Sequence, residues 1–150
     1  MASHYAGSLE ETQALDAYIK LVRATEAVTT RIHRHLNTVD LTISQFGVLE
    51  ALYFLGPLCQ SALAAKILRS GGNMTLVIDN LEKTGLVRRE RDSKDRRYIT
   101  VSLTDEGKKL IAEIFPVHVK AVMAEMSALS PNEQQLLEHL CRKLGKSDCP

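Results

Sequence analysis

The apolar positions of the chain change their spacing twice, and each spacing predicts a different kind of element. Residues 9–36 hold an apolar stripe at most helical steps and contain no proline or glycine, so one long helix is expected there. Thr42 and Gln45 form a capping-box pair at the start of a second helix, expected over residues 43–55. The glycine–proline pair that follows is a firm stop for that helix.

Two shorter helices precede the first change of spacing. They are expected over residues 60–68 and 71–84, the second with Ser70 as its N-cap and a glycine just beyond its end. The spacing then shortens to two, because apolar and polar residues alternate over residues 99–103 as in a half-buried strand. With the β-prone run before it, this segment predicts a hairpin whose polar tip is residues 92–96.

Helical spacing returns for the rest of the chain. A long helix is expected from Thr104, with Pro116 as a site of kinking, because a proline removes one backbone hydrogen bond inside a helix. A last helix, running to about Leu144, opens with Ser130 as its N-cap and Glu133 as the partner in its capping box. Both ends of the chain are therefore expected to consist of long helices.

This order of elements defines a fold class. Two short helices followed by a two-stranded hairpin make a winged helix-turn-helix, so the chain is expected to be mainly α, with a winged lobe over residues 42–104. Long helices over residues 9–37 and 105–145 flank this lobe. They carry more apolar stripe than so small a lobe can cover, which predicts that they pair with a second copy in a homodimer.

The formal net charge of the chain is only +1, so binding to a polyanion such as DNA would depend on a local cluster of basic residues. Six basic residues nonetheless fall within ten positions, residues 88–97, around the expected hairpin tip. A basic tip can reach the phosphate backbone or a narrow minor groove of DNA, and Asp95 is close enough in sequence to hold an arginine in one pose. The residues expected to bind DNA from the wing are Arg88, Lys94, Asp95, Arg96 and Arg97.

The expected fourth helix supports DNA binding, because a winged helix-turn-helix places the second of its two helices in the major groove. Met74, Ile78 and Leu81 share one face and are expected to be buried. On the other side, asparagine suits the edge of adenine, and a leucine can contact the methyl group of thymine. The residues expected to meet DNA from this helix are Ser70, Gly72, Asn73, Thr75, Leu76 and Asn80.

The segment from Ser70 to Leu110 resembles the recognition helix and wing of the MarR family of bacterial transcription regulators. Its most specific marks are the tip, Asp95, Arg96 and Arg97, and the close of the wing, Leu103, Thr104 and Gly107. The resemblance implies a homodimer whose outer helices form the interface and whose two winged lobes grip a palindromic operator. It also implies repression, relieved by a phenolic or other anionic aromatic ligand or by thiol oxidation. Two positions depart from the usual pattern: Leu76 replaces a frequent arginine, and Cys59 replaces a frequent serine or threonine cap.

Cysteine and histidine residues are the candidates for sensing an effector. Cys59 is expected at a helix N-terminus, where the helix dipole lowers the pKa of a thiol and favours redox or electrophile sensing; the alternative is that it only fills space. The resemblance places His33 and His35 near the ligand cleft of relatives. Two positions apart on a helix, these histidines are expected to face different sides and not to chelate a metal together, so no metal site and no cofactor is predicted.

Other classes of function find less support in the sequence. A Ser-His-Asp arrangement, a phosphate-binding loop and a metal-ligand cluster are all absent, which disfavours an enzyme. The chain has no apolar run long enough to cross a membrane and no signal-peptide pattern, and its cysteines match no disulfide framework, so a reduced, cytoplasmic protein is expected. The remaining alternative is a protein-interaction adaptor that does not bind DNA, which the basic wing disfavours.

Overall fold

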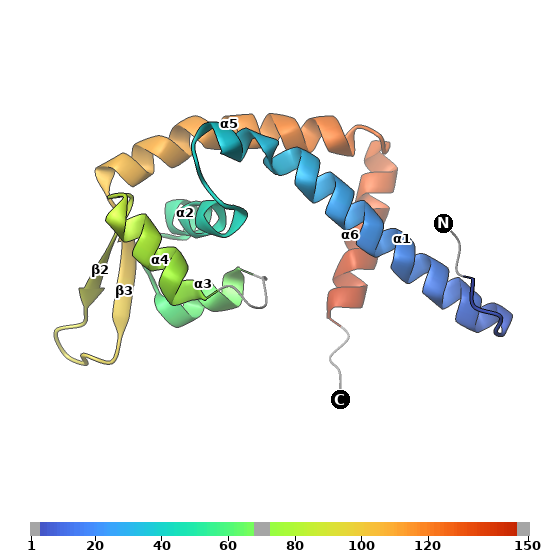
Figure 1. Cartoon of the computed structure of the whole chain (residues 1–150), viewed down its shortest axis with the longest axis horizontal. Helices are drawn as coiled ribbons and strands as arrows, with labels where there is room; N and C mark the ends of the chain where they lie inside the picture. Colours follow the sequence, from blue (N-terminus) through green and yellow to red (C-terminus); the bar gives the residue numbers. More distant parts are fainter. Residues whose placement is uncertain (1–3, 68–72, 147–150) are drawn as a thin grey trace. The chain divides into compact units, whose positions relative to one another are not determined.

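The structure, a computed structural model, describes residues 4–67 and 73–146. Figure 1 shows the order of its elements along the chain. The helices are α1 (Leu9–Ile32), the 3₁₀ helix η1 (His33–Thr38), α2 (Ile43–Leu55), α3 (Gln60–Lys66), α4 (Met74–Lys83), α5 (Asp105–Met126) and α6 (Pro131–Gly145). The strands are β1 (Leu58–Cys59), β2 (Val87–Arg91) and β3 (Ile99–Leu103). The predicted fold class, mainly α with a winged helix-turn-helix, is confirmed.

The chain forms two compact units. Residues 33–119 make up the winged lobe, and the described residues up to 32 and from 120 onward make up the unit of outer helices. The division falls inside α5, so this helix belongs to both units. Its first half contributes Ile111 and Ile114 to the core of the winged lobe.

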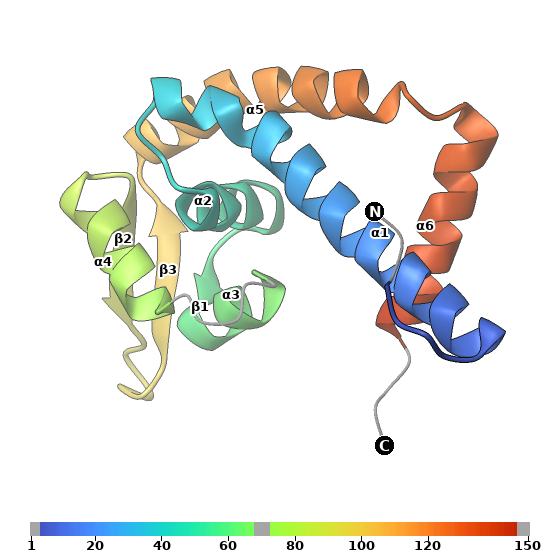
Figure 2. The ribbon, with the colours of Figure 1, turned by 45° about the vertical axis from the view of Figure 1, so that its right-hand side comes forward.

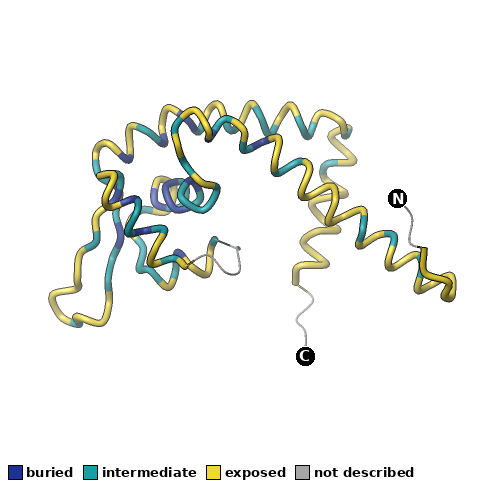
Figure 3. The backbone as a smooth tube through the Cα atoms, in the orientation of Figure 1, coloured by how far each residue is buried: buried dark blue, intermediate teal, exposed yellow. Residues whose placement is uncertain are grey.

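The core of the winged lobe forms around α2. Phe46, Val48, Leu49 and Leu52 of this helix are buried, and neighbouring positions are buried together because other elements contact α2 on several sides (Figure 3). Burying a side chain of this size contributes about 1.5–3 kcal/mol to folding. The buried side chains that complete the core are Leu36, Leu63, Ile78, Leu81, Val87, Val101, Leu103, Ile111 and Ile114.

The wing is an antiparallel hairpin with a very short third strand. β2 pairs with β3 so that Val87 lies opposite Leu103 and Arg91 lies opposite Ile99. β1 pairs with the other edge of β3, which gives the strand order β1-β3-β2 (Figure 2). The sequence did not predict β1, because a strand of two residues, Leu58–Cys59, is too short to show an alternating pattern.

The turn from the wing into α5 explains the spacing of Thr104 and Gly107. The Thr104 hydroxyl donates to the Gly85 carbonyl at 2.5 Å and accepts the N–H of Gly107 at 3.1 Å. The N–H of Thr104 donates to the carbonyl of Leu86. A Cβ at position 107 would stand 2.0 Å from that Leu86 oxygen, so only glycine fits there. The start of α5 is thereby joined to the residues that follow α4.

Two of the helix starts that were predicted from side-chain caps are confirmed. The capping boxes at Thr42 and Ser130 form as expected at the starts of α2 and α6. α5 continues as a helix through Pro116. The first helix, in contrast, was predicted to stay α-helical to residue 36, but it tightens into a 3₁₀ helix at His33. A 3₁₀ helix has about three residues per turn, which changes the directions of the histidines that it carries.

The start of α4 was predicted wrongly. The helix begins at Met74 with Asn73 as its N-cap, not at residue 71 with Ser70 as its cap. The cause is local, because the side-chain oxygen of Asn73 accepts the N–H of Leu76 at 3.3 Å and an asparagine cap satisfies that donor. Ser70 and Gly72, which were expected to contact DNA, lie outside the described residues.

The outer helices expose many apolar side chains. Leu136, Leu140 and Leu144 of α6 are 57%, 51% and 61% exposed, and none of the residues of α6 is buried. α1 likewise exposes Tyr18 and Val22. None of the described helices is long and apolar enough to cross a bilayer.

Candidate nucleic-acid interface

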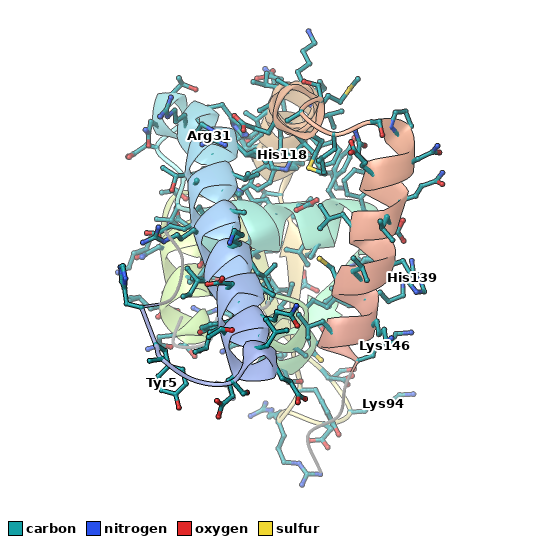
Figure 4. The ribbon with its side chains drawn as sticks, turned by 90° about the vertical axis from the view of Figure 1, so that its right-hand side faces the viewer. Tyr5, Arg31, Lys94, His118, His139 and Lys146 are labelled. Carbon is teal, nitrogen blue, oxygen red and sulfur yellow. The ribbon has the colours of Figure 1, made fainter. Side chains whose placement is uncertain are left out.

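The tip of the wing is a tightly hydrogen-bonded loop. The Asp92 carboxylate accepts the N–H of Lys94 at 2.7 Å and the N–H of Asp95 at 3.3 Å. Backbone hydrogen bonds from Asp92 to Tyr98 and from Tyr98 to Asp95 close the loop at 3.0 Å each. Lys94, labelled in Figure 4, therefore lies on a fixed turn at the end of the hairpin.

Asp95 holds the guanidinium of Arg97, the kind of pairing that the sequence predicted. Arg97 donates from Nε to Oδ1 at 3.0 Å and from Nη2 to Oδ2 at 2.8 Å. This bidentate pairing lowers the pKa of the Asp95 carboxyl and raises the pKa of Arg97. The side chain of Arg97 is still 87% exposed, so the pair adds little to stability. Its effect is to keep a cation in one pose at the surface, beside the exposed Arg96.

α4 buries one face and exposes the other, as predicted. Ile78 and Leu81 are buried, and Met74 is half-buried against the core. The exposed residues near its start are Asn73, Thr75 and Leu76, and Asn80 is half-buried. The helix therefore offers a mixed polar and apolar surface at its N-terminal end, the end that contacts base edges in helix-turn-helix proteins.

Two of these exposed side chains already have partners within the lobe. The Asn73 oxygen is used in the helix cap, and the Thr75 hydroxyl accepts a hydrogen bond from the side-chain amide of Gln60 at 2.7 Å. The second contact joins α4 to α3. Because the bidentate pairing of asparagine with adenine needs both side-chain atoms, base reading by Asn73 competes with its cap.

Arg89 differs from the other cations of the wing because it is paired with acids of α4, and the sequence did not predict this pairing. Its guanidinium pairs with Asp79 and lies 3.4 Å from a Glu82 oxygen, and its backbone N–H donates to Glu82 at 3.0 Å. These acids raise the pKa of Arg89, whose side chain is 23% exposed. Both acids belong to α4, so Arg89 fastens the wing to this helix. The signal in the sequence is the pair of acids three residues apart on the helix that precedes the basic strand.

Arg88 lies on the opposite face of β2, because side chains alternate along a strand. Its Nε lies 3.2 Å from the Ser102 hydroxyl and 3.3 Å from a Glu90 oxygen. It stands at the base of the hairpin, opposite Ser102, whereas Lys94 stands at the tip. A DNA contact by Arg88 stays a prediction.

Cys59 is the N-cap residue of α3, as predicted, but its thiol makes no capping hydrogen bond. Sγ lies 3.2 Å from the Ser61 hydroxyl. That hydrogen bond and the backbone N–H of Ala62 lower the pKa of the thiol. With Met74 and Arg97 it lines a pocket of about 400 Å³ that α3, α4 and the wing share. A change in this thiol would therefore occur next to both parts of the candidate interface.

Three histidine rings meet in the winged lobe. Nε2 of His35 and Nδ1 of His118 are 3.1 Å apart, so one ring donates to the other. The centroid of the His33 ring lies 5.5 Å from that of His118, and the Phe46 centroid lies 4.7 Å from it. The expectation that His33 and His35 face different sides was wrong. On a 3₁₀ helix, residues two apart point about 120° apart instead of about 160° as in an α-helix, so both rings reach His118.

Burial favours the neutral form of two of these rings, His35 and His118. It lowers the pKa of His118 from 6.5 to about 4, to which the charges of His35 and His33 also contribute, and it lowers the pKa of His35. Nδ1 of His35 is buried without a hydrogen-bond partner among the described residues, and a buried unpaired N–H is costly, so we assign the proton of His35 to Nε2. Among the described residues, no group of three His, Cys, Asp or Glu side chains is arranged to hold a metal ion.

Comparison with known proteins identifies the family of this fold. The model of the MarR family matches residues 41–99, from the start of α2 to the start of β3. Over 136 residues the chain is 35% identical to the HTH-type transcriptional regulator YkoM of Bacillus subtilis. This alignment covers 91% of this chain and 88% of the relative. The chain belongs to the MarR family.

Solved structures agree with the MarR assignment. The complex of S. aureus MepR with DNA is 25% identical, with a TM-score of 0.76 over 87% of this chain and 96% of that one. NadR in complex with 4-hydroxyphenylacetate is 29% identical, with a TM-score of 0.72 over 99% of each chain. The chain is a DNA-binding transcriptional regulator of the MarR family. Its relatives are transcriptional regulators and not enzymes, and the adaptor without DNA binding is not favoured.

Proposed function

We propose that this MarR-family regulator represses transcription by binding a palindromic operator as a homodimer, and that an effector releases it. The observation that carries the proposal is the fixed cation of the wing, because Arg97, held by Asp95, belongs to the same lobe as the exposed N-terminal end of α4. A recognition helix in the major groove and a basic wing on the neighbouring phosphates or minor groove bind DNA together. We infer a cytoplasmic location, because the operator DNA lies there.

The proposed contacts divide between the helix and the wing. The start of α4 meets base edges, and the cations of the wing tip meet phosphates or enter the minor groove, where Asp95 positions Arg97 and does not touch DNA itself. The residues proposed for the interface are Asn73, Thr75, Leu76, Asn80, Lys94, Asp95, Arg96 and Arg97, with Ser70 and Gly72 outside the described part of the chain.

A second copy of the chain covers the outer helices in this proposal. α6 buries none of its residues within one chain although Leu136, Leu140 and Leu144 recur every four positions along it. So continuous an apolar stripe favours association, because its burial removes apolar surface from water. The two-fold symmetry of a dimer then places the recognition helices about 34 Å apart, one turn of DNA, which calls for a palindromic operator.

Two sites in the winged lobe support control by an effector. The cluster of His33, His35 and His118 beside Phe46 offers imidazole hydrogen bonds and an aromatic surface, which suit a phenolic or other anionic aromatic ligand. Binding of 4-hydroxyphenylacetate by NadR supports this ligand class. The second site is Cys59, because oxidation or alkylation of its thiol would add atoms to the pocket beside α4 and the wing.

A fluorescence-anisotropy titration tests the proposal. The purified protein is titrated against the DNA upstream of its own gene, with random DNA as the control, at two salt concentrations. We expect one dimer per site, an affinity well above that for random DNA, and a loss of affinity as salt rises, because phosphate contacts release counterions. Equal binding to both DNAs would contradict an operator at this position. An absence of binding at low salt would favour the adaptor.

A further inference from the structure

A pocket of about 330 Å³ lies at the base of the wing. It is formed by the end of α2 and the Gly56–Pro57 turn after it, one residue of β2, two of β3 and the first turn of α5, all within the winged lobe. The residues that matter for its chemistry are Leu52, Tyr53, Pro57, Arg88, Ser102 and Lys108. None of these residues lines the pocket beside Cys59 or belongs to the histidine cluster, so this base-of-wing pocket is a separate site.

The charge of the base-of-wing pocket is unbalanced. Arg88 and Lys108 are both cations, and none of the described residues that line the pocket is acidic. Lys108 forms no ion pair with any described residue. Arg88 uses only its Nε for Ser102 and for Glu90, an acid that is 67% exposed, so both Nη groups lack a hydrogen-bond partner within the described residues. Two cations therefore share one concave surface without an anion between them.

The apolar lining of the pocket decides which anion fits. Pro57 contributes apolar surface and Tyr53, at the end of α2, is 42% exposed, whereas Leu52 is only 3% exposed and forms the buried floor. A volume of about 330 Å³ falls in the range of sites that bind small molecules. A phosphate of the DNA backbone would use the two cations and leave this apolar surface in water. A small molecule that carries both an apolar body and a negative charge would use the whole lining.

We propose that the base-of-wing pocket binds a small organic anion, with its carboxylate on Arg88 and Lys108 and its apolar body on Tyr53 and Pro57. Arg88 precedes Arg89, the residue that fastens the wing to α4, so an anion that binds Arg88 acts on the strand that sets the position of the wing. An effect of the anion on operator affinity follows from this contact and rests on the proposed function. Binding of the anion itself does not depend on DNA.

Calorimetric titration of the full chain with 1-naphthoate tests the proposal. 1-Naphthamide has the same rings without the charge, and acetate has the charge without the rings, so both are expected to bind at least about tenfold more weakly. Arg88→Gln and Lys108→Gln are each expected to weaken naphthoate binding about tenfold. The matched controls are Arg91→Gln and Lys109→Gln, which remove exposed cations of the same elements outside the pocket and are expected to leave binding unchanged.

Three outcomes would overturn the inference. They are an absence of naphthoate binding, equal binding of naphthoate and naphthamide, and an unchanged affinity in both pocket variants when thermal unfolding shows them folded. His118→Gln provides a further check, because loss of binding in that variant alone would place the ligand at the histidine cluster. A lower salt slope of operator binding in Arg88→Gln, with no naphthoate bound by the wild type, would assign Arg88 to DNA.

The same samples separate this inference from the proposed function. Normal operator binding without naphthoate binding overturns the base-of-wing pocket and leaves the operator proposal in place. Naphthoate binding that depends on Arg88 and Lys108, in a protein that does not distinguish its operator from random DNA, supports the pocket and contradicts the operator proposal.

Discussion

Arg89 on β2 is paired with Asp79 on α4, and the backbone N–H of the same arginine donates to Glu82, three residues further along that helix, at 3.0 Å. The pairing joins the two parts of the MarR fold that the proposal brings to DNA. The position of the wing beside α4 therefore depends on an arginine whose charge is already paired within the protein.

Replacing Arg89 by glutamine is expected to lower the free energy of unfolding by about 1 kcal/mol, because a partly exposed charged hydrogen bond is lost and two acids on α4 lose their counterion. Operator affinity should fall more than affinity for random DNA, because the wing and the helix no longer hold one arrangement. Urea unfolding and anisotropy titrations measure the two effects. Arg91→Gln, which removes an exposed cation of the same strand, is the control, and equal effects in both variants would contradict the assignment.

The wing cations predict a change in salt dependence. Arg97→Ala and Arg96→Ala should each weaken operator binding and reduce its salt slope by about one unit for each phosphate contact that is lost. Anisotropy titrations at several salt concentrations measure the slope. Arg23→Ala, at an exposed position of α1, removes the same charge outside the winged lobe and should leave the slope unchanged. A slope that stays the same in both wing variants would refute the contact.

Asn73 has two roles to separate, the helix cap and the reading of a base. Asn73→Ala should lower the free energy of unfolding by about 1 kcal/mol, because the N–H of Leu76 loses its acceptor. Asn73→Ser keeps a cap and removes the amide, so it should preserve stability yet cost about 1–3 kcal/mol of operator affinity and relax base preference. Titrations with operator and random DNA test this. If the serine variant loses equal affinity for both DNAs, Asn73 only positions the helix.

The histidine cluster predicts a pH dependence of stability. The pKa of His118 is about 4 in the folded chain against an ordinary value of 6.5, so between these pH values the unfolded chain binds a proton that the folded chain does not. The free energy of unfolding should therefore fall as pH decreases from about 6.5 towards about 4. Urea unfolding across this range measures it. His118→Gln should show a shallower fall than the wild type, and parallel curves would show that His118 is not responsible.

The thiol of Cys59 should react faster than an ordinary thiol. The hydrogen bond with the Ser61 hydroxyl and the backbone N–H of Ala62 lower the pKa of the thiol, so more thiolate is present at pH 7 and iodoacetamide should alkylate it faster than a cysteine in a short peptide. Mass spectrometry of the labelled peptides follows the rate, with the exposed Cys141 as the internal reference. Ser61→Ala should slow the reaction, because the Ser61 hydrogen bond is the largest cause of the lowered pKa. A rate equal to that of the peptide would remove Cys59 as a sensor.

Short-range signals explain why much of the wing could be predicted. Asp95 and Arg97 are two residues apart, so their pairing needs no knowledge of the rest of the fold. The capping box at Thr42 is equally local. The start of α4 was missed although its signal is local too, because both Ser70 and Asn73 are good N-caps and the glycines between them allow either start.

The sequence by itself determined the order of the elements, the buried face of α4, the basic tip of the wing and the likeness to the MarR family, since each of these depends on residue type and short-range spacing. Only the tertiary structure decided what individual side chains meet. His35 contacts His118, 83 positions away. Of two neighbouring arginines, Arg89 contacts Asp79, whereas Arg88 contacts Ser102. The physical reason is that such contacts follow from strand register and helix packing. Because of these, cations of the same basic segment lie in different surroundings: one against a helix, one in a pocket and others at the surface.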